Sequence, residues 1–431
     1  MRIDRLHIEN FKKFQRTEQP FELHKQFTLL VGDNGSGKTS VLDALAVVLG
    51  LWHKAAPGSG WRNILPEEVW LNPVPAGDRV QFKPQLPSLI RVEGQIGSHQ
   101  QLSWTRMIRE GGTRTTNAEA RQAEAAIIET VQAAEAQQAP LPVLAYYGAG
   151  RAWLPTNKRP TLRTSQRKPQ QFDAYRKCLD TRIRDQDLNE WFLFETAAAN
   201  GHGEGRPGYR AVKRAVLQCI PEADGLRYDS DLKEIVLSIR GFEQPYYNLS
   251  AGQRMMLAMV ADIAIKAVTL NSYLLGPDHP GASDPMHVLR QSPGVVLIDE
   301  LDVHLHPIWQ RRVATDLKRT FEKIQFVCTS HSPQVIGEVR PEEVRLLRGE
   351  HAEKPAQSFG MDSNWVVEVL MEGAERNPTI KGRLENIFRL VEQKDLPAAE
   401  EEITKLRSET GNSDRLQRAA SLVERIKVLG K

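Results

Sequence analysis

The sequence has few cysteines, no long apolar run and almost no net charge. Its three cysteines, Cys178, Cys219 and Cys328, lie far apart and form no C-x-x-C pair, which argues against a zinc site and suits a reducing cytosol. No apolar stretch approaches the roughly 18 residues of a membrane span, and no signal segment follows Met1. The net charge of +3 gives no general attraction to nucleic acid or membrane. These absences predict a soluble, cytoplasmic protein without a membrane partner.

The bulk composition is that of an ordinary globular protein. A length of 431 residues predicts two or three domains and allows a large core. Charged residues make up 26% and hydrophobic residues 40% of the chain, which are typical values for soluble proteins. Function must therefore be inferred from local motifs.

The most informative motif is a glycine-rich stretch at residues 32–39. Its letters, Gly-Asp-Asn-Gly-Ser-Gly-Lys-Thr, fit the pattern G-x-x-x-x-G-K-[ST] of phosphate-binding loops. The apolar residues 27–31 before it predict a buried strand, and residues 40–49 after it predict a helix. Glycines let backbone N–H groups turn toward phosphate oxygens, and the helix N-terminus adds positive potential. This strand–loop–helix context predicts an ATP site.

Residues of this loop have distinct expected roles. Lys38 would reach the outer phosphates, and the hydroxyl of Thr39 would be a Mg²⁺ ligand. The loop residues expected to bind the nucleotide are Gly32, Asn34, Gly35, Ser36, Gly37, Lys38, Thr39 and Ser40.

Two carboxylates end another apolar strand, at residues 294–298. In P-loop enzymes the aspartate at this edge, here Asp299, holds Mg²⁺, and the following Glu300 is placed to polarise the attacking water. A further apolar strand, residues 324–329, leads to His331, which could hydrogen-bond a γ-phosphate. Open α/β sheets bind ligands at the edge where such strands end. The expected catalytic residues are Glu300, His331 and Lys38, and the expected metal ligands are Thr39 and Asp299.

A serine–glycine turn precedes a long apolar helix that we expect from Met255 to Val268. Ser250 offers a hydroxyl, Gly252 a backbone N–H and the helix its dipole, all of which suit a phosphate. A serine at a helix N-cap also needs no function, so this turn is weak evidence by itself. Farther along, His304 and His306 have no nearby third ligand, which favours a structural or dimer-contact role over metal binding.

Several segments lie outside the expected sheet. Residues 55–77 are rich in Pro, Gly and Trp and are expected as an irregular surface loop. Residues 89–108 predict a β-hairpin. An insertion is expected at about 109–210, and within it the segment 151–177 is a basic loop with one acid, Asp173. This loop either contacts nucleic acid or another polyanion, or is a solvated surface segment.

The last part of the chain, residues 346–431, is expected to be a helical region following a head at residues 1–345. Apolar residues recur there at helical spacing, for example Leu384, Ile387 and Val391. Such a stripe either packs on the head or forms a surface that docks a partner.

The order of these motifs resembles that of ABC-type ATPases. The phosphate loop, Leu-Ser-Ala-Gly-Gln at 249–253, Asp299-Glu300, Asp302 and His331 follow one another as they do in that family. The stretches 8–14 and 299–307 are similar to the soluble branch with the RecF, SMC and OLD-type ATPases. The stretches 146–151 and 358–365 are similar to PtuA, the family of ATPase subunits of Septu and retron-linked antiphage systems.

This resemblance implies a fold and a shared nucleotide site. The implied fold class is α/β, an ABC-type head with a mixed sheet, antiparallel N-terminal strands and flanking helices. Two heads would pair head-to-tail as a homodimer, so that Ser250, Gly252 and Gln253 of one close over the γ-phosphate held by Lys38 of the other. Asp302 would lie on the seam. The implied ligands are ATP and Mg²⁺.

The resemblance also leaves gaps. Lys12 or Lys13 would match the basic N-terminal residue that approaches the phosphates in the SMC branch. No glutamine of the Q-loop type is evident; the predicted hairpin and residues 146–151 are where it should be sought, and Arg151 could substitute as a nucleotide contact. The segment between Thr39 and Leu249 has no sustained heptads, which argues against a chromosome clamp. Beyond Arg345 no D-x-D cluster of an OLD-type nuclease is present, so we expect that the chain does not cut DNA itself.

The leading hypothesis is therefore an ATP-binding and hydrolysing switch subunit of an antiphage complex. As the PtuA resemblance implies, ATP-dependent head dimerisation would control a separate HNH-type nuclease. One alternative is a RecF-like DNA-repair ATPase that acts on DNA directly, and DNA-stimulated hydrolysis that depends on Arg163, Arg167 and Lys168 would favour it. Another is a transporter's nucleotide-binding subunit, against which the SMC-like N-terminus and residues 304–307 both argue.

Overall fold

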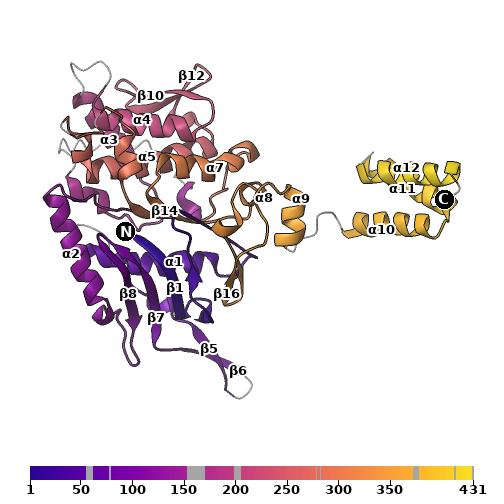
Figure 1. Ribbon diagram of the computed structural model, residues 1–431, viewed down its shortest axis with the longest axis horizontal. Helices are drawn as coiled ribbons and strands as arrows, with labels where there is room; N and C mark the ends of the chain where they lie inside the picture. The colour runs from indigo at the N-terminus through magenta and orange to yellow at the C-terminus, as the bar shows by residue number, and fades with distance from the viewer. Residues whose placement is uncertain are drawn as a thin grey trace. The chain divides into compact units, whose positions relative to one another are not determined.

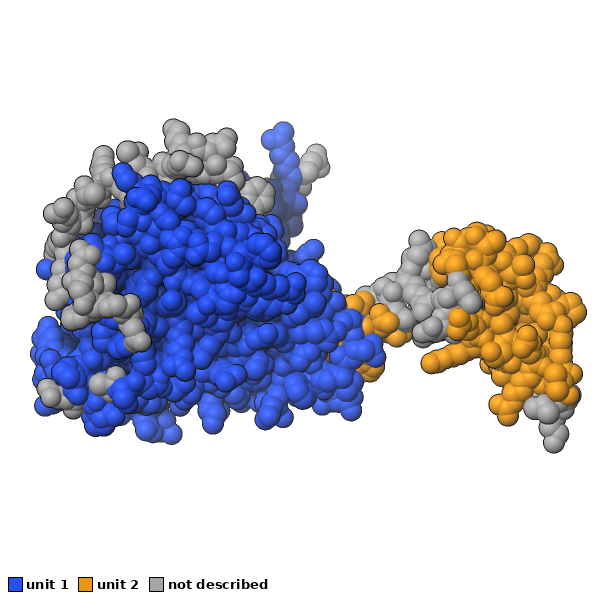
Figure 2. Space-filling model, turned by 90° about the horizontal axis from the view of Figure 1, so that it is seen from above, with its two compact units in different colours: residues 1–363 blue, residues 364–431 orange. Residues whose placement is uncertain are grey.

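The computed structural model divides the chain into two compact units, residues 1–363 and 364–431 (Figures 1 and 2). The residues whose structure is described are 1–54, 62–76, 79–152, 170–198, 205–277, 279–281, 283–371, 378–411 and 414–429.

A six-stranded sheet forms the centre of the first unit, in the order β16-β15-β4-β14-β13-β9. Every neighbouring pair is parallel except β15 and β16. Four of the strands, β4, β9, β13 and β14, are buried along their whole length, which explains their uninterrupted apolar runs. The strand bounds are β4 (Phe27–Val31), β9 (Val143–Tyr147), β13 (Gly294–Ile298), β14 (Ile324–Thr329), β15 (Val344–Arg348) and β16 (His351–Glu353).

An antiparallel sheet of N-terminal strands faces the central sheet across helix α1 (Figure 1). Ten of the twelve residues of α1 (Lys38–Leu49) are buried, because the helix contacts strands of both sheets. The strand order is β2-β1-β7-β8, with β3 beside β1. The strand bounds are β1 (Arg2–Phe11), β2 (Phe14–Arg16), β3 (Phe21–Glu22), β7 (Ser88–Ile96) and β8 (His99–Ile108). The predicted hairpin and the predicted mixed α/β fold are both confirmed.

One sequence-based expectation is wrong. The end of the segment expected as an irregular loop is strand β5 (Leu71–Ala76), which pairs antiparallel with β6 (Arg79–Pro84). Prolines at 73 and 75 suggested a loop. They occupy alternate positions of the strand, however, and the residues next to them supply the hydrogen bonds to β6.

Helices and a small sheet make up the rest of the first unit. Helix α5 packs against β9, α4 packs on both α5 and α7, and α2 packs against β7 and β8. The predicted core strand β9 lies inside the segment expected as an insertion, so only parts of 109–210 lie outside the sheet. The bounds are α2 (Arg121–Glu135), α3 (Asp185–Ala198), α4 (Pro207–Cys219), β10 (Ala223–Asp229), β11 (Glu234–Ile239), β12 (Phe242–Pro245), α5 (Ala251–Leu270), α6 (His287–Gln291), α7 (Pro307–Thr320) and α8 (Pro333–Ile336).

The second unit is built from three helices with their own core. After α9 (Ser363–Trp365) and a π-helical turn (Val366–Leu370), they are α10 (Pro378–Glu392), α11 (Leu396–Thr410) and α12 (Asp414–Leu429). The buried core residues are Leu384, Ile387, Val391, Ala399, Ile403, Leu406, Leu416, Ala419 and Val423. The predicted apolar stripes are therefore used within this unit, on helices that face one another. None of the helices in the described parts of the chain combines the length and apolar character that a bilayer span requires.

Candidate functional site

The phosphate-binding loop joins β4 to α1 through a tight backbone turn. Gly37 has a φ of 101°, and a Cβ there would lie 2.7 Å from the ring of Phe14, so only glycine fits. The ammonium of Lys38 donates to the carbonyl oxygens of Gly32 (2.7 Å) and Asp33 (2.8 Å). The buried residues of the loop are Ser36, Gly37 and Lys38. The half-buried ones are Gly32 and Ser40, and the exposed ones include Asn34, Gly35 and Thr39.

The charge of Lys38 is set by its surroundings. Burial lowers the pKa of its ammonium, and the negative charges of Asp299, Asp33 and Glu300 oppose that shift. The two carboxylates predicted at the end of β13 therefore lie within electrostatic reach of the loop lysine. This places a positive charge and two acids around one point at the edge of the sheet.

Thr39 and Asp299 meet although 260 residues separate them. The Thr39 hydroxyl donates to Asp299 Oδ2 (3.0 Å), and Thr329 Oγ1 donates to Asp299 Oδ1 (2.7 Å). Thr329 Oγ1 also accepts from the backbone N–H of Glu300 (2.7 Å), where the chain turns with a φ of 49°. A hydroxyl and a carboxylate in contact are the oxygen ligands that Mg²⁺ uses in P-loop enzymes. Thr329, which no motif in the sequence indicates, orients both carboxylate residues.

The residues that follow β14 are hydrogen-bonded to Asp302. Asp302 Oδ1 accepts from Ser330 Oγ (2.5 Å) and from the backbone N–H of His331 (3.3 Å). The structure thus brings together the half-buried His331 and the residue expected on the seam between heads. His306 caps α7, because its ring accepts from the N–H of Ile308 (3.3 Å), which fits the structural role expected for it.

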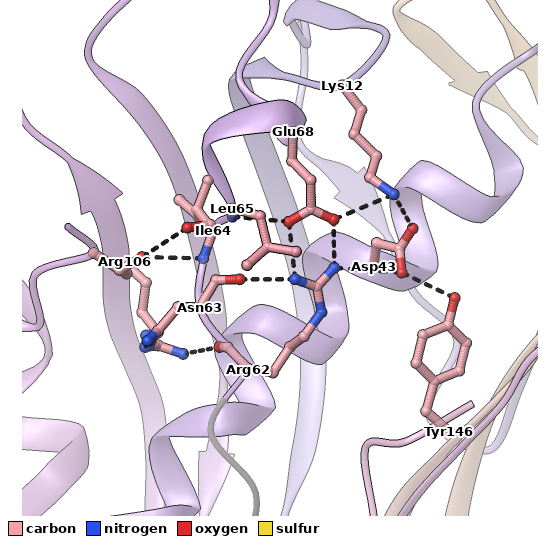
Figure 3. Close-up of polar contacts among 10 residues, drawn as sticks. Lys12, Asp43, Arg62, Asn63, Ile64, Leu65, Glu68, Arg106 and Tyr146 are labelled. Carbon is pink, nitrogen blue, oxygen red and sulfur yellow. Dashed lines mark hydrogen bonds and ion pairs between the residues drawn. The ribbon is translucent and has the colours of Figure 1, made fainter. Parts of the chain in front are cut away.

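The two N-terminal lysines have different surroundings. Lys12 bonds the carboxylate of Asp43 on α1 and lies 3.3 Å from Glu68 Oε1 (Figure 3). Arg62 donates twice to Glu68, at 2.8 and 2.5 Å. Lys13 instead donates to the carbonyl of Gly35 within the phosphate loop. Of the two candidates, Lys13 is therefore the one that contacts the loop, and Lys12 belongs to an ion-pair network behind it.

A buried arginine anchors that network to β8. Arg106 is 1% exposed, and it donates to the carbonyl of Arg62 (2.6 Å) and the side chain of Asn63 (2.5 Å). Burial lowers the pKa of Arg106 to about 10. Its nitrogens hold the segment that carries Arg62 and Glu68, so this segment is fixed against α1.

The serine–glycine turn starts α5 as a capping box. Ser250 Oγ accepts from the N–H of Gln253 (3.3 Å), and the Gln253 side chain accepts from the N–H of Ser250 (2.9 Å). A Cβ at Gly252 would lie 2.4 Å from the carbonyl oxygen of His304, so a glycine is required there by packing within the chain. The Gln253 side chain is thus hydrogen-bonded to the residue that caps its own helix. Ser250 itself is exposed.

Two adjacent tyrosines at the end of β9 contact both nucleotide-associated helices. Tyr146 Oη donates to Asp43 on α1 (3.1 Å), and Tyr147 Oη donates to Asp262 on α5 (2.6 Å). They point to opposite faces because successive strand residues do so. Burial, and then the negative charge of Asp43, raise the pKa of Tyr146. The backbone N–H of Asp299 also donates to the Tyr147 carbonyl (2.7 Å). This pair lies where a Q-loop was sought.

Removing either tyrosine hydroxyl is expected to weaken the first unit. Because each hydroxyl donates to a carboxylate, Tyr146→Phe or Tyr147→Phe should lower the free energy of unfolding by about 2 kcal/mol. Chemical denaturation of the full chain measures this. Tyr247→Phe is the matched control, since its hydroxyl has no hydrogen bond to a described residue, and its effect should stay within about 0.5 kcal/mol. Equal effects of all three substitutions would contradict the tyrosine-pair interpretation.

Part of the predicted basic loop lies outside the described residues. This applies to residues 153–169, with Arg163, Arg167 and Lys168, and to the side chain of Arg151. Arg176 pairs with Asp173 (3.3 Å), so one of its described cations is already engaged.

The site fits a nucleoside triphosphate with a divalent cation. Ser36 Oγ is buried in the loop and has no hydrogen-bond partner among the described residues, so it can serve a phosphate oxygen. Within the described ranges, no group of three or more His, Cys, Asp or Glu side chains could hold a metal. Thr39 and Asp299, whose side-chain oxygens are in contact, would supply the protein ligands, with phosphate and water completing the shell, as Mg²⁺ prefers.

Family models match two long segments of the chain. A model described as "AAA domain" matches residues 5–193, and one described as "AAA domain, putative AbiEii toxin, Type IV TA system" matches residues 229–337. The first match contains the phosphate loop, and the second contains the turn that starts α5 and the two carboxylates that end β13. Both models describe AAA domains, so these matches and the site geometry make the chain similar to P-loop ATPases.

The relatives of the chain are retron and Septu ATPases. It is 33% identical over 171 residues to the Retron Ec83 probable ATPase of Escherichia coli, a match that covers 39% of this chain and 29% of that protein. It is 24% identical over 196 residues to Septu protein PtuA of Bacillus thuringiensis, covering 43% of this chain and 47% of PtuA. The matches thus span less than a third of the one relative and about half of the other.

A solved SMC head bound to the C-winged helix domain of ScpA also resembles the chain. The overlay has a TM-score of 0.49 and 16% sequence identity, and it covers 83% of this chain and 98% of the SMC head. At that score the likeness carries no argument about function.

Proposed function

We propose that the chain is the ATP-dependent switch subunit of an antiphage defence complex. The observation that carries the proposal is the meeting of Lys38 and Thr39, which follow β4, with Asp299 and Glu300, which follow β13, across the carboxyl end of the intervening parallel strand β14. The relation to retron and Septu ATPases supports the defence context. Lys38 would neutralise the outer phosphates, Thr39 and Asp299 would hold Mg²⁺, and Glu300 would orient and polarise the attacking water.

The complete site would be shared between two copies of the chain. Ser250 is exposed at the N-terminus of a 20-residue helix, a position suited to a phosphate from another molecule. Asp302 and His331 lie together beside the carboxylates and would sense whether a γ-phosphate and a second head are present. Dimerisation would therefore depend on ATP, and hydrolysis would let the two copies separate. We propose that this cycle restrains or releases a separate HNH-type nuclease.

The test is to co-express the full chain with an HNH-type nuclease, the class of partner proposed here, and to purify the complex with and without ATP–Mg²⁺. We expect one stable complex whose nuclease activity changes at least about tenfold with nucleotide state. The matched control is the chain carrying Lys38→Ala, for which the nucleotide should have no effect. A chain that does not bind the nuclease, dimerises with ATP and has an ATPase activity that responds to DNA would contradict the proposal and favour the repair-type alternative.

A further inference from the structure

The β5–β6 hairpin has one wholly apolar face and one face that carries its polar side chains. In its register Leu71 lies opposite Pro84, Pro73 opposite Phe82, and Pro75 opposite Val80. Because directly paired residues share a face of a two-stranded sheet, one face consists only of apolar side chains. Its six members are Leu71, Pro73, Pro75, Val80, Phe82 and Pro84.

This apolar face is exposed to solvent. Phe82 is 64% exposed, Val80 58% and Leu71 46%, and every residue of β6 is exposed. In Figure 1 the hairpin extends away from the two sheets of its unit. An isolated two-stranded hairpin is only marginally stable in water, and contiguous exposed apolar surface marks an interaction site. The hairpin therefore carries a surface that the described part of the first unit does not cover.

The two edges of the hairpin differ in their ability to add a strand. Pro73 and Pro75 have no N–H, so the hydrogen-bonded pairs of this ladder are those of the even-numbered residues of β5. The prolines therefore block the outer edge of β5. On β6, Val80 and Phe82 direct their N–H and C=O groups outward. One edge of the hairpin is closed to strand addition and the other is open.

Charge decides what can pair with the open edge. Arg79, Gln81 and Lys83 lie on the face opposite Val80 and Phe82, and neither Arg79 nor Lys83 forms an ion pair with a described residue. An antiparallel pairing of two β6 strands centred on Gln81 would place Arg79 of one copy opposite Lys83 of the other. Like charges directly opposite one another are destabilising, so a second copy is a poor partner in this register.

We propose that β6 is a docking edge for a partner protein that contributes an extended segment of alternating apolar and acidic residues. Its backbone would pair with Val80 and Phe82, its apolar side chains would extend the exposed apolar face, and its acids would lie beside Arg79 and Lys83. This strand addition is independent of nucleotide, because none of the groups involved belongs to the phosphate-binding site.

The test uses a capped peptide of alternating Val and Glu, six residues long to match β6, labelled for fluorescence anisotropy with the full chain. We expect saturable binding below about 1 mM. Val80→Pro removes one outward N–H without touching the ladder and should weaken binding about tenfold or more, whereas Val80→Thr should keep it. The double change Arg79→Glu and Lys83→Glu should transfer the preference to a Val–Lys peptide. ATP binding by each variant shows that the unit remains folded.

Other outcomes overturn the proposal. The absence of binding below about 1 mM would do so, as would equal binding of a peptide with the same composition in block order. Concentration-dependent dimerisation of the chain that Val80→Pro abolishes would assign the edge to a second copy instead.

Discussion

Lys38→Ala is expected to weaken ATP binding by about a hundredfold or more. The buried ammonium makes two charge-assisted hydrogen bonds to loop carbonyls, and a phosphate would accept comparable bonds from it. At about 1.5–3 kcal/mol for each bond, losing two corresponds to about a hundredfold weaker binding or more. Isothermal titration calorimetry of the full chain with ATP–Mg²⁺ measures the effect.

The control for this substitution is another lysine at the opposite edge of the same sheet. Lys323 is exposed, contacts Gln291 (2.6 Å) and precedes the first residue of β14. Lys323→Ala should leave ATP affinity unchanged. If Lys38→Ala bound ATP as tightly as the wild type, the phosphate-binding assignment of residues 32–40 would be wrong.

Glu300→Gln is expected to bind ATP and to stall before hydrolysis. The amide keeps the shape of the side chain but cannot take a proton from water, so turnover should fall by about 10²–10⁴-fold while affinity stays close to that of the wild type. Asp299 keeps its hydrogen bonds to Thr39 and Thr329, so the expected metal ligands are retained. Phosphate release under saturating ATP measures turnover, and direct titration with ATP measures affinity.

A stalled variant should also accumulate as the nucleotide-bound dimer. Sedimentation with ATP–Mg²⁺ would detect this, and Glu322→Gln, an exposed acid near the start of β14, is the matched control that should behave as the wild type. Wild-type turnover by Glu300→Gln would exclude Glu300 as the base that activates water. A loss of ATP binding by the same variant would instead assign it to nucleotide or metal binding.

Much of this arrangement could be predicted from the sequence because the signals are local. The phosphate loop lies within ten consecutive residues between an apolar strand and a helix, and each further candidate follows directly on an apolar run. Parallel strands bring their carboxyl ends to one edge, so residues placed there share that edge, and the strand order decides which of them lie close enough to touch. The structure bears this out for the contact between Thr39 and Asp299.

Partners at long range could not be predicted in this way. Tyr146 and Asp43 are 103 residues apart, and Tyr147 and Asp262 are 115 residues apart, so no spacing rule connects them. Strand periodicity predicts that two adjacent tyrosines face opposite sides, but not which helix covers each side. The choice between Lys12 and Lys13 was open for the same reason, because it depends on where Asp43 and Glu68 come to lie.

The sequence by itself thus determined the class of protein, the expected nucleotide loop and the acids at the strand ends, since these depend on contiguous residues and simple periods. Only the tertiary structure decided which side chains meet across the sheet and which strand edges stay open. The prolines of β5 illustrate the difference: read locally they predict a loop, but opposite β6 they lie on the outer side of a regular ladder. Pairing register is a property of two segments, and neither segment alone contains it.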